Sequence, residues 1–162
     1  MDEVDRIVAA WNRERPDLDV TPLEVLSRVS RLSRLLDKAR SAAFARHDLE
    51  TWEFDVLSAL RRNGDPYRLS PGQLVALTMV TSGTMTNRID RLAGRGLVRR
   101  LPDPADGRGV MVQLEESGRA VTDAALSDLL EVERSVLAVL TNGEHDQLAH
   151  LLRDLLTAFD PN

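Results

Sequence analysis

Arginine side chains are concentrated in one part of an otherwise acidic sequence of 162 residues. The formal net charge is -5, yet residues 81–109 hold three aspartates and six arginines: Arg88, Arg91, Arg95, Arg99, Arg100 and Arg108. Residues 115–162, by contrast, hold ten acids and three arginines. A guanidinium group donates forked hydrogen bonds to phosphates and to the edge of guanine. The basic segment therefore fits either a solvated face or a local nucleic-acid-binding surface, and charge alone does not choose between them.

Residue types that catalyse reactions or bind metals form no recognisable pattern. The sequence has no cysteine, which excludes disulfides, thiolate zinc sites and cysteine nucleophiles. His47 stands alone, and the five-residue spacing of His145 and His150 is poor for two ligands on one helix face. No nucleophile elbow or phosphate-binding loop occurs. We expect no enzyme activity, no metal and no cofactor.

The length fits one domain, or one protomer of an oligomer, with a core of its own. No apolar run approaches the length of a membrane span, and the acidic start MDEVDR does not resemble a signal peptide. We therefore expect a cytoplasmic protein without a membrane partner.

Two helices are predicted before residue 48. Apolar residues at i, i+3, i+4 and i+7 predict a short amphipathic helix over residues 2–15 that Pro16 ends: Val4, Ile7, Val8 and Trp11. Thr21 then resembles an N-cap with Pro22 at the first position and Glu24 completing a capping box. The apolar face that follows predicts a long helix, to about His47.

The middle of the sequence has the element order of a winged helix. Thr51 is expected to cap a helix that ends at Asn63–Gly64. LSPGQL, residues 69–74, predicts the start of a short helix through a Ser70–Gln73 capping box, and SGTMTNRIDRLAGRG predicts another. Two strands, LVRRL and VMVQL, flank the turn PDPADGRG. Two more helices are predicted over residues 116–140 and 142–158, the last capped by Thr141 and Glu144.

These motifs resemble the MarR family of bacterial transcription regulators. LSPGQL, SGTMTNRIDRLAGRGLVRR and DPADGRG carry the resemblance, which covers nearly the whole chain. It implies a mainly helical winged helix-turn-helix with a β-hairpin wing, in which residues 51–115 bind DNA and residues 1–47 and 116–162 form a homodimer. Two departures occur: the wing reads DGR where two adjacent arginines are common, and LEESG replaces the usual Leu-Thr.

The resemblance assigns the DNA contacts to the second helix of the helix-turn-helix and to the wing. The residues expected to face bases and phosphates on this helix are Ser82, Thr84, Thr86, Asn87, Arg88 and Arg91. Arg108 at the wing tip suits the minor groove, and Asp106 either orients Arg108 or shapes the wing. The alternative for Arg88 and Arg91 is ion pairing with Asp90 and other surface acids.

A narrower resemblance is to the urate-responsive branch of the family, which has an added N-terminal helix. It rests on WNRERPDLD, EFDVL, RRNGDPYRLSP and MTNRIDRL, and it implies an effector site of Trp11, Asp55, Asn63 and Arg100. A flat heterocyclic anion suits an indole, a guanidinium and an amide. Alternatively, Trp11 packs in a core and Asp55 forms a structural ion pair with Arg100.

The resemblance therefore predicts a dimeric regulator of an inverted-repeat operator, released from DNA by a small anionic effector such as urate. Two alternatives remain open at this point. In the first alternative, the effector belongs to another class, such as a phenolic acid, another purine or a carboxylate metabolite. In the second, the chain is a helical interaction module that binds no DNA.

Overall fold

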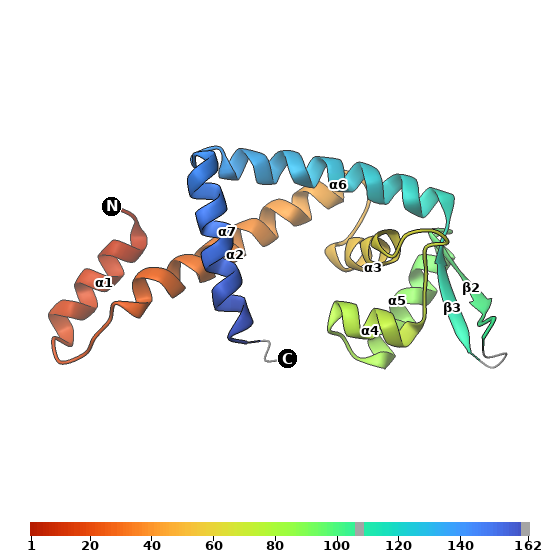
Figure 1. Ribbon diagram of the computed structural model, residues 1–162, viewed down its shortest axis with the longest axis horizontal. Coiled ribbons are helices and arrows are strands. Elements are labelled where there is room, and N and C mark those ends of the chain that lie inside the picture. Colours follow the sequence, from red (N-terminus) through yellow and green to blue (C-terminus); the bar gives the residue numbers. More distant parts are fainter. Residues whose placement is uncertain (106–108, 160–162) are drawn as a thin grey trace. The chain divides into compact units, whose positions relative to one another are not determined.

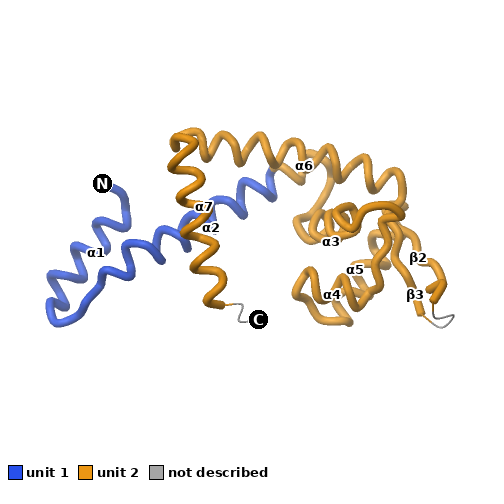
Figure 2. Tube along the Cα trace, in the orientation of Figure 1, with its two compact units in different colours: residues 1–42 blue, residues 43–162 orange. Residues whose placement is uncertain are grey.

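The computed structural model describes residues 1–105 and 109–159, and the chain forms two compact units, residues 1–42 and 43–162 (Figure 2). Figure 1 labels the helices and strands along the chain. In order they are α1 (Glu3–Glu14), α2 (Pro22–Ala45), α3 (Thr51–Arg62), β1 (Arg68–Leu69), α4 (Pro71–Thr78), α5 (Ser82–Gly94), β2 (Val98–Pro102), β3 (Val110–Leu114), α6 (Glu116–Leu137) and α7 (Asn142–Thr157).

The first unit contains α1 and most of α2. Asp2 caps α1 by accepting the amides of Val4 and Asp5, and α1 ends just before Pro16 as predicted. A small apolar cluster joins the α1 residues Val4 and Val8 to Val20. Helix α1 is therefore held by its cap and by a few buried valines.

Thr21 begins α2 in a different way from the predicted capping box. Its hydroxyl donates to Asp19 Oδ1 at 2.8 Å, and the Asp19 carboxylate also accepts the Thr21 amide at 3.0 Å. A short Asp side chain satisfies backbone donors two residues later in this way. Half of the predicted apolar face of α2 is exposed, namely Val25, Val29 and Leu32, while its last turn buries Ala43 and Phe44.

The core of the second unit is built around α3. The rings of Phe44 and Phe54 stack with centroids 4.1 Å apart, and Leu57 and Leu60 are fully buried on the inward face of α3, as predicted. Thr51 is the first helical residue and Glu50 is the N-cap, one position before the predicted cap. The helix ends at Asn63, followed by Gly64 with φ +77°, in agreement with the prediction.

Helices α4 and α5 form a helix-turn-helix. Ser70 caps α4 in the predicted capping box with Gln73, and Pro71 is at its first position. Met79 in the left-handed conformation (φ 51°) ends α4, and Thr81 caps α5 by accepting the Thr84 amide. Met85, Ile89 and Leu92 point from α5 into the core, as the sequence predicts.

The wing belongs to a three-stranded antiparallel sheet in the order β1-β3-β2. The pairs Val98↔Leu114 and Pro102↔Val110 set the register of the predicted hairpin. Strand β1, which the sequence analysis did not anticipate, has only two residues and pairs Leu69 with Val112. The mainly helical winged helix-turn-helix with a small β wing is confirmed (Figure 1).

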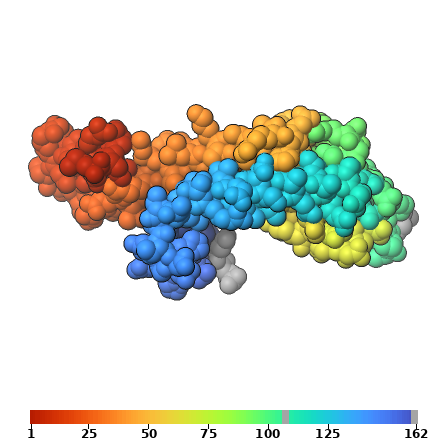
Figure 3. Space-filling view, turned by 90° about the horizontal axis from the view of Figure 1, so that it is seen from above, coloured from red at the N-terminus to blue at the C-terminus, as the bar shows by residue number. Residues whose placement is uncertain are grey.

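Helix α6 packs along α3 in the second unit, and the space-filling view shows the two side by side (Figure 3). Its first turn crosses the start of β2 at Gly118, which is buried against Leu97 and Leu114. Thr141 caps α7 with Glu144 as predicted. Among the described residues, no helix is long and apolar enough to cross a membrane.

Candidate nucleic-acid interface

The outer face of α5 is polar and open to solvent. Its apolar residues point inward, so the remaining positions of the first two turns are left on the surface: Ser82, Thr84, Thr86 and Asn87. The Thr86 hydroxyl donates to the Ser82 carbonyl at 3.1 Å, and the Thr81 hydroxyl donates to Thr84 Oγ1 at 2.9 Å. These short side chains are held close to the helix, where they are able to approach phosphates or thymine methyl groups.

Arg88 and Arg91 are held by Glu50 and Trp52 at the start of α3, two residues that no motif in the sequence marks as a site. Their guanidinium carbons lie 5.3 Å and 4.6 Å from the centroid of the Trp52 ring. Arg91 also donates to Glu50 Oε1 at 2.7 Å, and Trp52 Nε1 donates to Glu50 Oε2 at 2.6 Å. Both arginines therefore have partners within the protein. Arg88 lies over Trp52, and the acid that pairs with Arg91 is Glu50 and not the predicted Asp90.

Hydrogen bonding fixes the charge of Glu50. The bond from Trp52, and next the bond from Arg91, lower the pKa of the Glu50 carboxyl. Glu50 is therefore an anion beside the exposed face of α5. A cavity of about 540 Å³ opens here, lined by Glu50, Trp52, Gly83, Thr84, Asn87, Arg88 and Arg91.

Arg95, at the end of α5, fixes the position of this helix on α3. Its Nη1 donates to Glu53 Oε1 at 2.7 Å, and the hydrogen bond to Glu53 raises the pKa of the Arg95 guanidinium. Glu53 is only 2% exposed, and its other oxygen accepts the Glu50 amide at 2.9 Å. Both oxygens of this buried carboxylate accept hydrogen bonds, so the bond from Arg95 fixes the end of α5 at one position on α3.

The next two arginines lie on β2 and have different partners. Arg99 donates to Gln113 Oε1 at 2.9 Å and lies 3.2 Å from Glu115, so it is tied to β3 and the start of α6. Arg100 donates to Asp90 Oδ1 of α5 at 2.7 Å. The printed sequence gives no indication of this pairing, because ten residues and the end of a helix separate the two side chains. Arg100 thus joins strand β2 of the wing to helix α5.

The remaining residues of the predicted effector site lie in both units. Asn63 is the C-cap of α3 and donates through Nδ2 to the Arg68 carbonyl at 2.8 Å, and Asp55 is half-buried on the same helix. Trp11 belongs to the first unit, where its side chain is 48% exposed. It is therefore not a core residue of that unit.

The predicted wing residues Asp106 and Arg108 lie outside the described residues. The base of the loop is described: the Asp103 amide donates to the Gly109 carbonyl at 2.9 Å, and Asp103 Oδ1 accepts the Ala105 amide at 2.9 Å. The bond between Asp103 and Gly109 therefore joins the two sides of the hairpin at the base of the loop.

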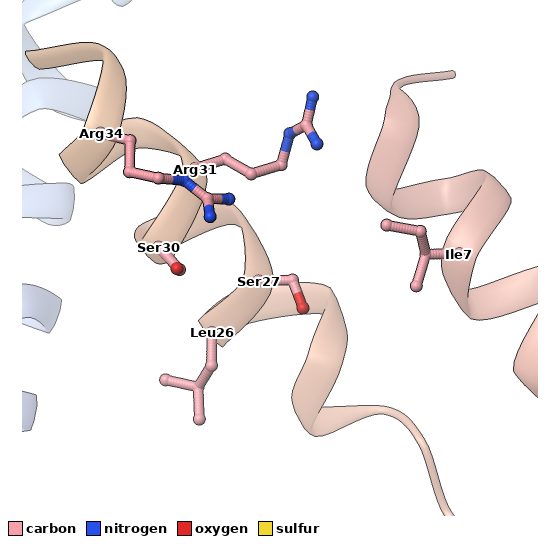
Figure 4. Close-up of a pocket in the computed structure, with 6 residues that line it drawn as sticks. All are labelled: Ile7, Leu26, Ser27, Ser30, Arg31 and Arg34. Carbon is pink, nitrogen blue, oxygen red and sulfur yellow. The ribbon is translucent and has the colours of Figure 1, made fainter. Parts of the chain in front are cut away.

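A second cavity, of about 320 Å³, lies within the first unit. Figure 4 shows Ile7 of α1 facing Ser27 and Arg31 of α2 across it. Arg31 and Arg34 line this cavity, which is open to solvent. Among the residues described, no cluster of three or more histidine and carboxylate side chains is arranged to hold a metal ion.

A helix-turn-helix with an exposed polar second helix, followed by a two-stranded wing, defines a DNA-binding winged-helix protein. A sequence model of the MarR family matches residues 47–109. The transcriptional regulator PecS of Dickeya dadantii is 41% identical over 150 residues, which cover 93% of this chain and 90% of that protein. The transcriptional repressor NicR of Pseudomonas putida is 33% identical, over 86% of this chain and 89% of that protein.

A solved structure of a mutant MarR from E. coli complexed with operator DNA has the same fold. It superposes with a TM-score of 0.70 and 26% identity, and it covers 90% of this chain and 97% of that one. The chain belongs to the MarR family of DNA-binding transcriptional regulators, and it is not an enzyme.

Proposed function

We propose that the chain represses transcription by reading an inverted-repeat operator through α5 and the wing, and that a small anionic aromatic effector such as urate releases it. The observation that carries the first part is the outer face of α5. Its apolar side is buried, and Ser82, Thr84, Thr86 and Asn87 are exposed. Arg88 and Arg91 add two guanidinium groups to the same helix.

The wing supplies the second proposed contact. Arg108 would enter the minor groove beside the site of α5, where the narrow groove has a strong negative potential. Asp106 would orient Arg108 or shape the turn. The described base of the hairpin supports this proposal, because the Pro102↔Val110 pair and the hydrogen bond from the Asp103 amide to the Gly109 carbonyl keep the two strands together up to the loop.

A dimer is proposed because two long helices each expose a row of apolar side chains. The row on α2 includes Val25, Leu26, Val29, Leu32 and Leu35. The row on α7 is Leu148, Leu151, Leu152, Leu155 and Leu156. Exposed patches of this kind mark interaction surfaces. Two protomers would present two copies of α5 to successive major grooves, one helical turn apart.

The effector part of the proposal rests on Arg100. This residue matches the guanidinium of the urate-responsive branch, and its ion pair with Asp90 connects it to α5. An anion that recruits Arg100 would remove this contact, so that ligand and DNA act on the same helix. Trp11, Asp55 and Asn63 complete the proposed effector set.

A gel-shift titration tests both parts. The probe is a duplex with the promoter region beside the protein's own gene, and the competitor is a scrambled duplex of equal length. Specific retardation that urate reverses supports the full proposal. Retardation reversed by a phenolic acid or an aliphatic carboxylate, but not by urate, assigns the other effector class. Equal retardation of both duplexes contradicts operator reading.

A further inference from the structure

The first turn of α3 meets the exposed side of α5 through Glu50 and Trp52. Glu50 accepts one hydrogen bond from Arg91 at 2.7 Å and another from the Trp52 indole at 2.6 Å. The ring of Trp52 lies beneath both guanidinium groups, 5.3 Å from Arg88 and 4.6 Å from Arg91. We call Glu50 and Trp52 the arginine clamp.

The clamp lies on a surface that solvent reaches. The Arg91 and Glu50 side chains are 52% and 59% exposed, and both line the open cavity with Thr84 and Asn87. A buried ion pair at this place would be a structural element, but an exposed pair is able to open when a better partner arrives. The negative charge of Glu50 also opposes phosphate on the face where this protein needs to attract it.

We propose that the clamp sets the DNA specificity of the protein by withholding Arg91 from DNA that lacks the operator sequence. This inference rests on the proposed function of α5. Opening the Glu50–Arg91 pair costs one charge-assisted hydrogen bond. A single phosphate contact returns about as much as that hydrogen bond but does not replace the contact with the Trp52 ring, so Arg91 stays paired on arbitrary DNA. A forked contact to a guanine edge returns two bonds, so the operator opens the clamp.

Trp52 has a separate part in this arrangement. Its ring face attracts both guanidinium groups and limits where they lie above α5. Its indole N–H also holds the carboxylate of Glu50 toward Arg91. Trp52 is thus a positioning residue, which acts on DNA only through the two arginines.

The central experiment measures the affinity of Glu50→Gln for the promoter duplex and for the scrambled duplex over a series of salt concentrations. Glutamine keeps an acceptor for the Trp52 indole and removes the charge. We expect affinity for scrambled DNA to rise by about two- to fivefold. The slope of log K against log salt on that DNA should steepen by about 0.9, the value for one added phosphate contact. Promoter affinity should change less, so the ratio of the two affinities falls.

The matched control is Glu131→Gln. Glu131 is an exposed carboxylate of α6 that pairs with Arg134, so its removal changes the net charge equally, away from α5. If Glu50→Gln and Glu131→Gln give the same slope and the same affinity ratio, the clamp does not set specificity. In Glu50→Gln/Arg91→Gln the slope should return to its original value, because no freed guanidinium remains.

Two further variants separate the clamp from folding and from the reading surface. Trp52→Phe keeps a ring face and should retain most promoter affinity, whereas Trp52→Leu should lose it. Because Trp52 also packs against the core of the second unit, the melting temperature of both variants is measured beside binding. If Arg91→Gln does not weaken promoter binding, the proposed reading surface is contradicted. If Arg91→Gln weakens promoter binding but Glu50→Gln leaves the affinity for scrambled DNA unchanged, only the clamp is contradicted.

Discussion

The described arginines of the basic segment differ in their partners, and the partner decides what each side chain is able to do. Arg95 is committed to the buried Glu53, and Arg99 to Gln113 and Glu115. Arg88 and Arg91 lie over Trp52 on an exposed face. A count of positive charges treats these side chains alike, whereas we expect the arginines with weak, exposed partners to reach DNA more readily than those with buried or multiple partners.

Arg100 and Arg99 form a matched pair for testing the effector site. Arg100→Gln should keep most DNA affinity but require much more urate for release, because its contact with Asp90 links the ligand to α5. Trp11→Phe should have the same effect. Arg99→Gln is the control, since Arg99 contacts β3 and not α5. Release of Arg100→Gln at the same urate concentration as the unmodified protein would place the effector elsewhere.

At the scale of elements, short caps and close contacts fix the helices of the second unit. The capping boxes at Ser70 and Thr141 were predictable, because the cap and its partner lie three residues apart in the sequence. The N-cap Glu50 was missed because Thr51 is a better capping residue by type. Strand β1 was missed because it is two residues long and depends on pairing with β3.

The candidate site was predictable in part for the same reason. The face of α5 follows from helical periodicity, which is local. Glu50 and Trp52 lie at the start of α3, and their contacts with Arg88 and Arg91 join residues about forty positions apart. The partner of Arg100 is likewise set by the fold and not by any spacing.

Gly118 marks the close contact between α6 and the start of β2. A Cβ atom there would overlap the Leu97 carbonyl oxygen and lie 2.8 Å from Leu114 Cδ1. Gly118→Ala should lower the free energy of unfolding by about 1–3 kcal/mol, as for other overpacked sites. Gly143→Ala on α7 is the control, because a Cβ meets nothing there, and it should leave stability unchanged or slightly higher. Equal urea midpoints for the two variants would contradict this packing.

Helix α1 should loosen in acid. Arg28 donates to Asp2 at 2.8 Å and to Asp5 at 2.5 Å. The hydrogen bond from Arg28 is the main cause that lowers the pKa of Asp2 from 3.8 to about 2. A carboxyl group whose pKa is lower in the folded state stabilises the fold at pH values above its unfolded-state pKa. This stabilisation is lost as the pH falls through the folded-state pKa. We therefore expect α1 to loosen between about pH 4 and pH 2.

Trp11 emission in a Trp52→Phe protein measures this loosening. Arg28→Gln should weaken α1 at neutral pH and reduce its pH dependence in that window. Arg6→Gln should do neither, because Arg6 pairs only with Glu3 in the same helix among the described residues. A pH dependence that survives in Arg28→Gln would assign the acid response to another group.

Across the whole molecule, the row of exposed leucines on α7 favours the proposed dimer. No residue of α7 is buried in the chain by itself, although the helix is capped and regular. Helices of this length take most of their stability from packing of an apolar face. A second protomer is the simplest cover for this face and for the exposed apolar row of α2.

Sedimentation at micromolar concentration should therefore show a species of about twice the 18.0 kDa chain mass. Leu151→Glu/Leu155→Glu should dissociate it and abolish tight operator binding, since one winged helix alone makes few contacts. Asp146→Lys, an exposed change on the same helix, serves as the control. A stable monomer that binds its operator tightly would contradict the dimer.

The proposed function depends most directly on operator reading by α5. Arg88→Ala tests it by fluorescence anisotropy on the promoter duplex at fixed salt, beside Arg153→Ala, an exposed arginine of α7. We predict that Arg88→Ala weakens promoter binding by about 1–3 kcal/mol and reduces discrimination against the scrambled duplex. Arg153→Ala should bind like the unmodified protein. Equal promoter affinity of Arg88→Ala and the unmodified protein would contradict the account of α5 as the reading helix.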